Sequence, residues 1–212
     1  MYEYILFDLD GTLSDTSEGV TKGVQIALRE FGIEAELKDL RRFIGPPLQY
    51  SFSHFYGFDE EQCNKAIAIY RKYYVGGGMF ENTPYEGLHE LLDKIRAAGK
   101  KLAVATSKLE PAAVEVLERN GLKRHFDLIC GASEDGRITS KIEVLEDYFV
   151  RAGNPDRSSV VLIGDTHFDA DGAAAAGIDC IGVLYGFGTR EELEEAGVTR
   201  IAETVEDIFP ML

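Results

Sequence analysis

The segment Tyr4–Thr16, YILFDLDGTLSDT, constrains the fold more than any other stretch of this 212-residue chain. It begins with large apolar residues, typical of a buried central strand, and becomes acidic at Asp8 and Asp10. Side chains alternate along a strand, so both carboxylates lie on one side of its carboxyl end, where sites occur in open α/β sheets. Gly11 allows a sharp turn close to a ligand. Two neighbouring acids at a buried strand end repel each other, and a bound cation relieves that repulsion.

From Pro84 onward, short apolar segments alternate with amphipathic ones. Strands are predicted at 102–107, 126–131, 160–165 and 180–184, and helices at 87–98, 111–119, 141–151, 171–176, 189–196 and 204–208. This alternation predicts an α/β fold, a doubly wound parallel sheet covered by helices on both faces.

Residues 15–83 have a different composition and contain no strand-like stretch. Helices are predicted at 17–31, 37–43, 48–56 and from about 60 to 74, and Asp59 with Gln62 forms a capping box before the last of them. We therefore expect two domains. Residues 1–14 plus 84–212 form the α/β core, and residues 15–83 form a smaller all-helical domain inserted after the first strand.

Charge and cysteine usage limit the partners. The net charge of −15 argues against nucleic acid and anionic membranes, which attract basic surfaces. A small phosphorylated substrate is compatible with it, because a divalent cation and lysines reverse the field locally. Cys63, Cys130 and Cys180 are far apart and odd in number, which favours reduced thiols. The chain shows neither a signal peptide pattern nor ~20 consecutive apolar residues, so we expect a cytoplasmic protein. The sequence is compatible with a monomer and with a dimer.

Four motifs in chain order resemble those of the haloacid dehalogenase-like phosphatase superfamily. They are Asp8-Leu9-Asp10-Gly11-Thr12, the strand end Thr106-Ser107, Lys141 at a helix start, and Gly164-Asp165 followed by Asp169. The inserted helical segment resembles the cap of the phosphoglycolate phosphatase-like branch. The resemblance covers nearly the whole chain and implies a Rossmann-like core with a helical lid.

This resemblance implies phosphate monoester hydrolysis through an aspartyl-phosphate. Asp8 corresponds to the nucleophile and Asp10 to the general acid and base. Thr106, with Ser107 beside it, and the backbone amides at Gly11 correspond to the groups that bind the phosphoryl oxygens.

A lysine completes the phosphate site in this family, and two lysines compete for that role. Lys141 matches the family position, although Ile142 stands where many relatives have proline. Lys108 follows the second motif closely and is the alternative.

The family resemblance also implies a metal site, for which Mg²⁺ is expected because the ligands are hard carboxylate oxygens. Asp8, Asp165 and the backbone carbonyl of Asp10 correspond to its ligands. Asp169 positions them or acts through water. His167 is expected to be a loop residue near the site.

The substrate is left open by the sequence. Phosphoglycolate, a nucleoside 5′-monophosphate and a sugar phosphate are all compatible. Gly45, in the segment Phe43–Leu48, resembles the cap loop that contacts substrate. A β-phosphoglucomutase-like mutase is the alternative enzyme, although Thr12 favours a phosphatase. A receiver-type signalling domain is the alternative from another class, and the helical insertion argues against it.

Overall fold

The computed structural model describes residues 2–212 and divides them into two compact units. One unit contains the residues up to Ser14 together with Pro84–Leu212, and the other is Asp15–Thr83. The chain passes between them at β2 (Ser14–Asp15) and β3 (Thr83–Pro84), which pair as a two-stranded sheet. These two-residue strands were not predicted, because they are too short to show a periodic pattern.

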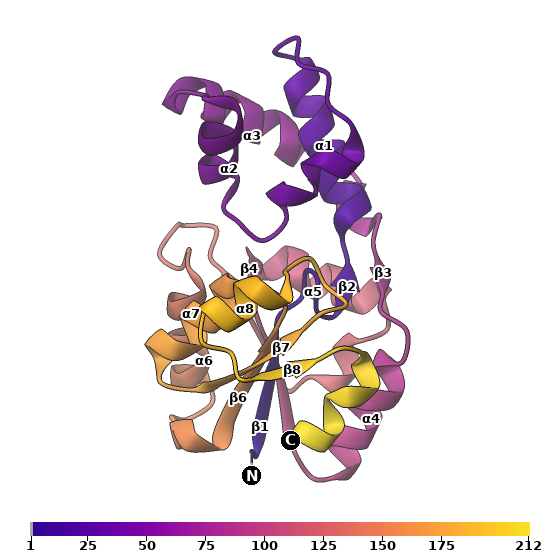
Figure 1. The fold of residues 1–212 in the computed structure, drawn as a ribbon, viewed down its shortest axis with the longest axis vertical. Helices are drawn as coiled ribbons and strands as arrows, with labels where there is room; N and C mark the ends of the chain where they lie inside the picture. The colour runs from indigo at the N-terminus through magenta and orange to yellow at the C-terminus, as the bar shows by residue number, and fades with distance from the viewer. Residues whose placement is uncertain (1) are drawn as a thin grey trace. The chain divides into compact units, whose positions relative to one another are not determined.

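The larger unit is built on a six-stranded sheet in the order β5-β4-β1-β6-β7-β8 (Figure 1). Every pairing between these neighbours is parallel. The strands are β1 (Tyr4–Phe7), β4 (Lys101–Leu109), β5 (Leu128–Ala132), β6 (Val160–Gly164), β7 (Asp179–Val183) and β8 (Arg200–Ala202). The predicted doubly wound α/β fold is confirmed. The final strand β8 was not predicted, since only three residues carry it.

The strand order fixes where a site can form. From β1 the chain proceeds to β4 and β5 on one side, and then returns to β6, β7 and β8 on the other side. The order therefore reverses at β1 and β6. The carboxyl ends of these two strands flank the topological switch point, where open α/β sheets bind their ligands.

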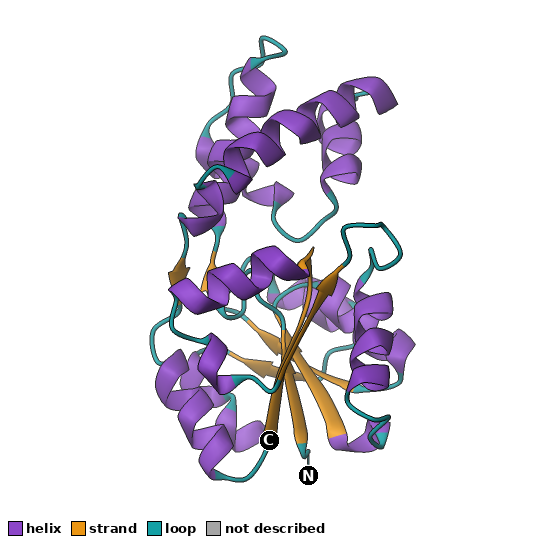
Figure 2. Cartoon of the chain, turned by 180° about the vertical axis from the view of Figure 1, so that it is seen from behind, coloured by secondary structure: helices purple, strands orange, loops and turns teal. Residues whose placement is uncertain are grey.

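Helices cover both faces of this sheet (Figure 2). They are α4 (Leu88–Ala97), α5 (Glu110–Arg119), α6 (Lys141–Arg151), α7 (His167–Ala176) and α8 (Arg190–Glu195). Short 3₁₀ turns are η3 (Lys123–His125), η4 (Arg157–Ser159), η5 (Val205–Asp207) and η6 (Phe209–Met211). Of these, η5 stands where a helix was predicted at 204–208, and η6 follows that range. α6 and α7 pack on each other, and both contribute to the core cluster that contains Leu6 and Leu162.

The second unit is helical. It contains α1 (Ser17–Arg29), η1 (Leu37–Phe43), α2 (Leu48–Tyr56), α3 (Glu60–Val75) and η2 (Gly78–Phe80). Phe43 and Phe52 are buried with their ring centroids 5.0 Å apart, so aromatic packing joins η1 to α2. Asp59 and Gln62 form the predicted capping box at the start of α3.

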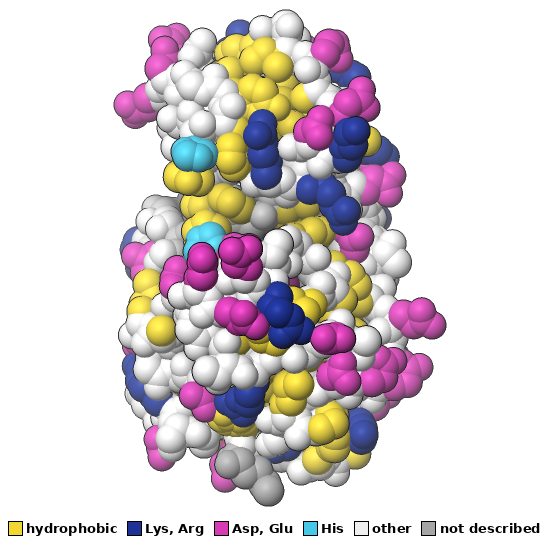
Figure 3. Space-filling view, in the orientation of Figure 1, with side chains coloured by type: hydrophobic (Ala, Val, Ile, Leu, Met, Phe, Trp, Pro, Cys, Tyr) yellow, Lys and Arg dark blue, Asp and Glu magenta, His cyan; other side chains and the backbone are white. Residues whose placement is uncertain are grey.

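Among residues 2–212, no helix combines the length and the apolar character that crossing a bilayer demands. Cys63 and Cys130 are buried and Cys180 is partly buried, and all three are unpaired thiols. Acidic and basic side chains are interspersed on the face shown in Figure 3.

Candidate active site

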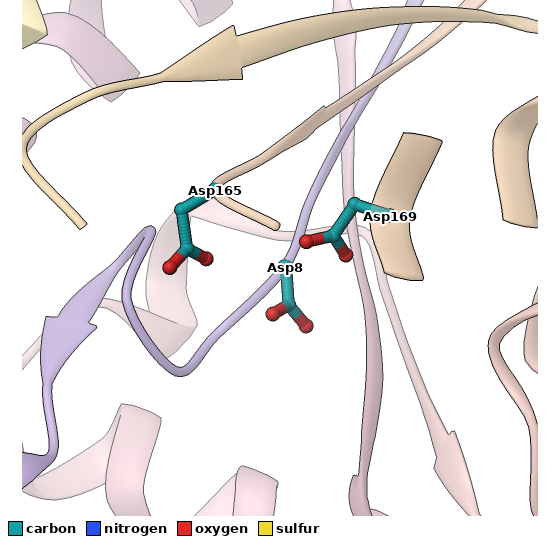
Figure 4. A group of neighbouring side chains, drawn as sticks. All are labelled: Asp8, Asp165 and Asp169. Carbon is teal, nitrogen blue, oxygen red and sulfur yellow. The ribbon is translucent and has the colours of Figure 1, made fainter. Parts of the chain in front are cut away.

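Three buried carboxylates meet at the switch point. Asp8 directly follows β1, Asp165 directly follows β6, and Asp169 lies in the first turn of α7 (Figure 4). One oxygen from each lies within 4.8 Å of the others, and none of the three residues is more than 9% exposed. The structure thus brings together three of the predicted metal ligands. The fourth, Asp10, was expected to act through its backbone carbonyl, and its side chain is not part of this group.

Lys141 provides the positive charge in this cluster. Its Nζ lies 2.7 Å from Oδ1 of Asp8 and 2.8 Å from Oδ1 of Asp169, and it donates to the backbone carbonyl of Ala105 at 2.9 Å. Lys141 is the first residue of α6, whose start is fixed by the capping box of Ser140 and Glu143. Burial alone would lower the pKa of Lys141, but the two carboxylates raise it, so the ammonium stays charged.

One ammonium does not balance three buried carboxylates. Burial raises the pKa of Asp8 to about 6, even though Lys141 opposes that shift. Burial, together with the charges of Asp169 and Asp8, also raises the pKa of Asp165 well above its usual range. The carboxylate oxygens of this cluster repel one another when they are charged, and a divalent cation would relieve that repulsion. The donor set is entirely hard oxygen, so the residues present fit an ion of the Mg²⁺ class better than zinc or copper.

Asp165 is oriented by hydrogen bonds to both of its oxygens. Thr12 donates its hydroxyl to Oδ1 at 3.1 Å, and the backbone N–H of Phe187 donates to Oδ2 at 2.9 Å. Gly11 has a φ of +86°, and a Cβ at this position would lie 2.1 Å from Oδ2 of Asp165. Glycine is therefore required here both for the turn and for the close approach of the carboxylate.

The segment Gly186–Gly188 also packs against Asp165. A Cβ on Gly186 would lie 2.4 Å from Cβ of Asp165, and one on Gly188 would lie 2.0 Å from its carbonyl oxygen. The sequence analysis did not predict a place for this segment at the acidic cluster. The signal available was a pair of glycines just after the strand that follows the fourth motif, at the same edge of the sheet.

Asp169 is held from two sides. Its Oδ2 accepts from the backbone N–H and the hydroxyl of Thr166, each at 3.1 Å, while its Oδ1 faces Lys141. This capping box explains why α7 begins at His167 and not at Asp171 as predicted. His167 itself is the first residue of that helix, and its Nδ1 pairs with the carboxylate of Glu192.

The end of β4 brings a second lysine to the first motif. Nζ of Lys108 lies 2.9 Å from Oδ2 of Asp10. Thr106 is buried, and its hydroxyl accepts from the backbone N–H of Lys108 at 3.2 Å, whereas Ser107 is exposed. Each aspartate of the first motif therefore has its own lysine, Lys141 for Asp8 and Lys108 for Asp10.

Gly45 belongs to the helical unit. It follows η1 and the extended residue Ile44, has a φ of +99°, and is exposed. Gly45 lies in the helical unit, whereas the acidic cluster lies in the other unit, and the contact of Gly45 with substrate stays a prediction.

The reversed strand order and the acidic cluster at its switch point place this chain among the doubly wound α/β proteins, with a site at the switch point that can bind a cation. Residues 5–183 match the family model described as haloacid dehalogenase-like hydrolase. The chain belongs to this family, as its four motifs predict.

Individual relatives agree with this assignment. The chain is 42% identical over 193 residues, 91% of it and 87% of the relative, to a protein named 5′-nucleotidase from Pseudomonas aeruginosa. It is 36% identical to a protein named tyrosine-protein kinase PtkA from Mycobacterium tuberculosis, over 97% of this chain and 71% of that one. A solved structure described as a predicted phosphatase from Clostridium acetobutylicum matches with a TM-score of 0.94 and 41% identity, over 100% of this chain and 98% of the other. The predicted enzyme class, phosphoric monoester hydrolase, is confirmed at this level.

Proposed function

We propose that this chain is a Mg²⁺-dependent phosphatase that hydrolyses a small phosphorylated metabolite through an aspartyl-phosphate. The observation that supports this best is Asp8 itself. It is buried at the switch point, pairs with Lys141, and shares an oxygen cluster with Asp165 and Asp169. A carboxylate in such a place can act as a nucleophile towards phosphorus when positive charge offsets its repulsion from phosphate.

The reaction has two steps. Asp8 attacks phosphorus in line, and the bond from phosphorus to the leaving oxygen breaks while Asp10 gives that oxygen its proton. Water then attacks the phosphorylated Asp8, Asp10 takes the proton of the water, and the bond between Asp8 and phosphorus breaks. The products are the alcohol and inorganic phosphate, and Asp10 ends protonated, as it began.

The remaining polar groups bind the phosphoryl oxygens and the ion. Lys141, Thr106, Ser107 and the amide of Gly11 hold the phosphoryl oxygens. Asp8, Asp165 and the carbonyl of Asp10 would hold Mg²⁺, and Asp169 would fix Lys141 and orient the groups around the ion. When bound, the ion supplies positive charge where a carboxylate meets a phosphate dianion.

The preferred substrate is a nucleoside 5′-monophosphate, because the relative with 42% identity is named a 5′-nucleotidase. Phosphoglycolate and sugar phosphates are the competing candidates. Residues 15–83 act as a cap, and its segment Gly45–Leu48 contributes to the choice of leaving group. The unpaired cysteines support a reducing, cytoplasmic location.

A phosphate-release screen over phosphorylated metabolites, with Mg²⁺ and with chelator, tests the proposal. Steady release from a 5′-monophosphate that needs Mg²⁺ and is lost in Asp8→Asn supports it. Product analysis separates the alternatives. An isomerised sugar phosphate without free phosphate would indicate a mutase, and a stable phosphoprotein that never turns over would indicate a receiver-type domain. Phosphate transferred to an added peptide tyrosine instead of water would indicate an activity like that named for the mycobacterial relative.

A further inference from the structure

The two lysines of the site hold different aspartates in different ways. Lys141 lies between Asp8 and Asp169, within 2.8 Å of both. Lys108 pairs with Asp10, and the side chains of this second pair are 9% and 21% exposed. A pair this well shielded from water holds its geometry more firmly than an ion pair on the surface.

The backbone at the end of β4 fixes where the Lys108 side chain starts. The pairing of β4 with β5 changes register between Ala105 and Leu109. Irregularities of this kind bend a strand and redirect a side chain. The hydroxyl of Thr106 then accepts the N–H of Lys108 at 3.2 Å, so a local hydrogen bond stabilises the bend.

The two carboxylate oxygens of Asp10 have different surroundings. Oδ2 faces Nζ of Lys108 at 2.9 Å. Oδ1 is buried and has no hydrogen-bond partner within residues 2–212. Most buried polar atoms are hydrogen-bonded, so an oxygen in this loop that the chain leaves without a partner is open to a group from outside the chain, such as a substrate oxygen or a water molecule.

We propose that Lys108 is a positioning residue. It holds Asp10 by Oδ2 and so presents Oδ1 to the leaving-group oxygen and, in the second step, to the water. This inference rests on the proposed function, in which Asp10 moves the proton. It assigns Lys108 a task separate from that of Lys141, because the ammonium of Lys141 lies at Asp8 and Asp169, whereas that of Lys108 lies at Asp10.

The proposal predicts which substrates depend on Lys108. A leaving group that is a strong base needs a correctly aimed proton, whereas a weakly basic one departs without it. The probes are phenyl phosphate and p-nitrophenyl phosphate, because phenolate is a considerably stronger base than p-nitrophenolate. The measured quantity is the first-turnover rate of phenol or nitrophenol release at saturating Mg²⁺, which isolates the first step from dephosphorylation.

In Lys108→Met, the rate with phenyl phosphate should fall by about tenfold or more, and by no more than the roughly 10²–10⁴-fold that general acid–base catalysis contributes. The rate with p-nitrophenyl phosphate should fall several-fold less, and KM should change little for either. Lys108→Arg, which keeps a cation at Oδ2, should recover part of the loss. Lys123→Met removes an exposed lysine that pairs with Glu118, and should behave as the wild type. Circular dichroism and the thermal shift caused by Mg²⁺ report whether each variant is folded.

A double-mutant cycle with Asp10→Asn decides whether Lys108 acts through Asp10. If it does, Lys108→Met causes almost no further loss in the Asp10→Asn background. Two results would overturn the inference and leave the proposed function standing. One is an equal fall in the first-turnover rate of Lys108→Met on both substrates, and the other is a fall of the same size when Lys108→Met is combined with Asp10→Asn. If Asp10→Asn itself shows no dependence on the leaving group, the proposed role of Asp10 fails, and the inference fails with it.

Discussion

Replacement of Lys141 by methionine removes the ammonium from the acidic cluster while keeping a side chain of similar length. In the wild type, Nζ of Lys141 lies 2.7 Å from Asp8 and 2.8 Å from Asp169. Removing one partner of a buried ion pair costs about 3–5 kcal/mol, since the remaining charge stays buried without compensation. Because two carboxylates lose their partner here, we expect the free energy of unfolding at pH 7.5 without Mg²⁺ to fall by an amount at the upper end of that range.

The stability lost in Lys141→Met should be smaller in acid. The pKa of Asp8 is raised to about 6 by burial, so between about pH 4 and pH 6 the native protein holds a proton that the unfolded chain has released. Asp8 therefore favours the native state less and less as pH rises through this window. Without Lys141 the pKa of Asp8 rises further, and protonation at pH 5 neutralises the carboxylate that the variant cannot pair. We therefore expect a smaller loss of stability at pH 5 than at pH 7.5.

Urea denaturation followed by circular dichroism at the two pH values, with EDTA, measures this loss. Lys123→Met is the matched control, because its exposed pair with Glu118 should contribute at most ~1 kcal/mol at either pH. A loss for Lys141→Met below ~1 kcal/mol at pH 7.5, or one that is the same at pH 5, would refute the reasoning, because the cluster would then not need the ammonium.

Three further expectations concern catalysis, the ion and the helical unit. Asp8→Asn should abolish phosphate release with an unchanged circular dichroism spectrum, since the amide has nearly the same shape but is a poor nucleophile; retention of more than a few per cent of the activity would contradict this. Mg²⁺ should raise the melting temperature more at pH 8 than at pH 5, because Asp8 and Asp165, whose pKa values are raised by burial, must lose their protons to bind it; an equal shift at both pH values would count against a site made of these residues. Replacing residues 45–48 by Ala-Gly-Ser-Ala should lower kcat/KM for the preferred metabolite far more than for p-nitrophenyl phosphate, and equal kinetics on that metabolite would make the loop a simple connector.

The elements with a strong local signal were predictable. α6 begins and ends at the predicted residues, since Ser140 and Glu143 form a capping box and an amphipathic stripe follows. β8 and the β2–β3 pair were missed, because two or three residues carry no periodicity and form strands only where a neighbour pairs with them. The predicted start of α7 was wrong, because Asp169 was assigned to the metal site alone. Asp169 is also the N3 residue of the capping box whose N-cap is Thr166.

The members of the site were predictable, but several of their contacts were not. Asp8 and Asp165 end neighbouring strands, so the sheet order alone brings them together at the switch point. The partner of Lys108 could not be read from spacing. Lys108 lies in the part of β4 where the register with β5 shifts, and a strand pattern in the sequence shows neither that shift nor the contact with Asp10. Local sequence gave two candidate lysines for one role, and the fold gives each of them a separate aspartate.

The glycines around Asp165 show why part of the site carries no visible motif. Gly186 and Gly188 bring no functional group, and their contribution is the space that a side chain would fill. That space lets the backbone N–H of Phe187 reach Oδ2 of Asp165 at 2.9 Å. A carboxylate fixed by a backbone donor keeps its direction whether or not an ion is bound, which lowers the cost of ordering the site when ligand arrives. Gly186→Ala should therefore weaken Mg²⁺ binding although residue 186 has no ligand atom in its side chain, and calorimetric titration of the folded variant measures this; unchanged affinity would mean that the close packing serves the fold alone.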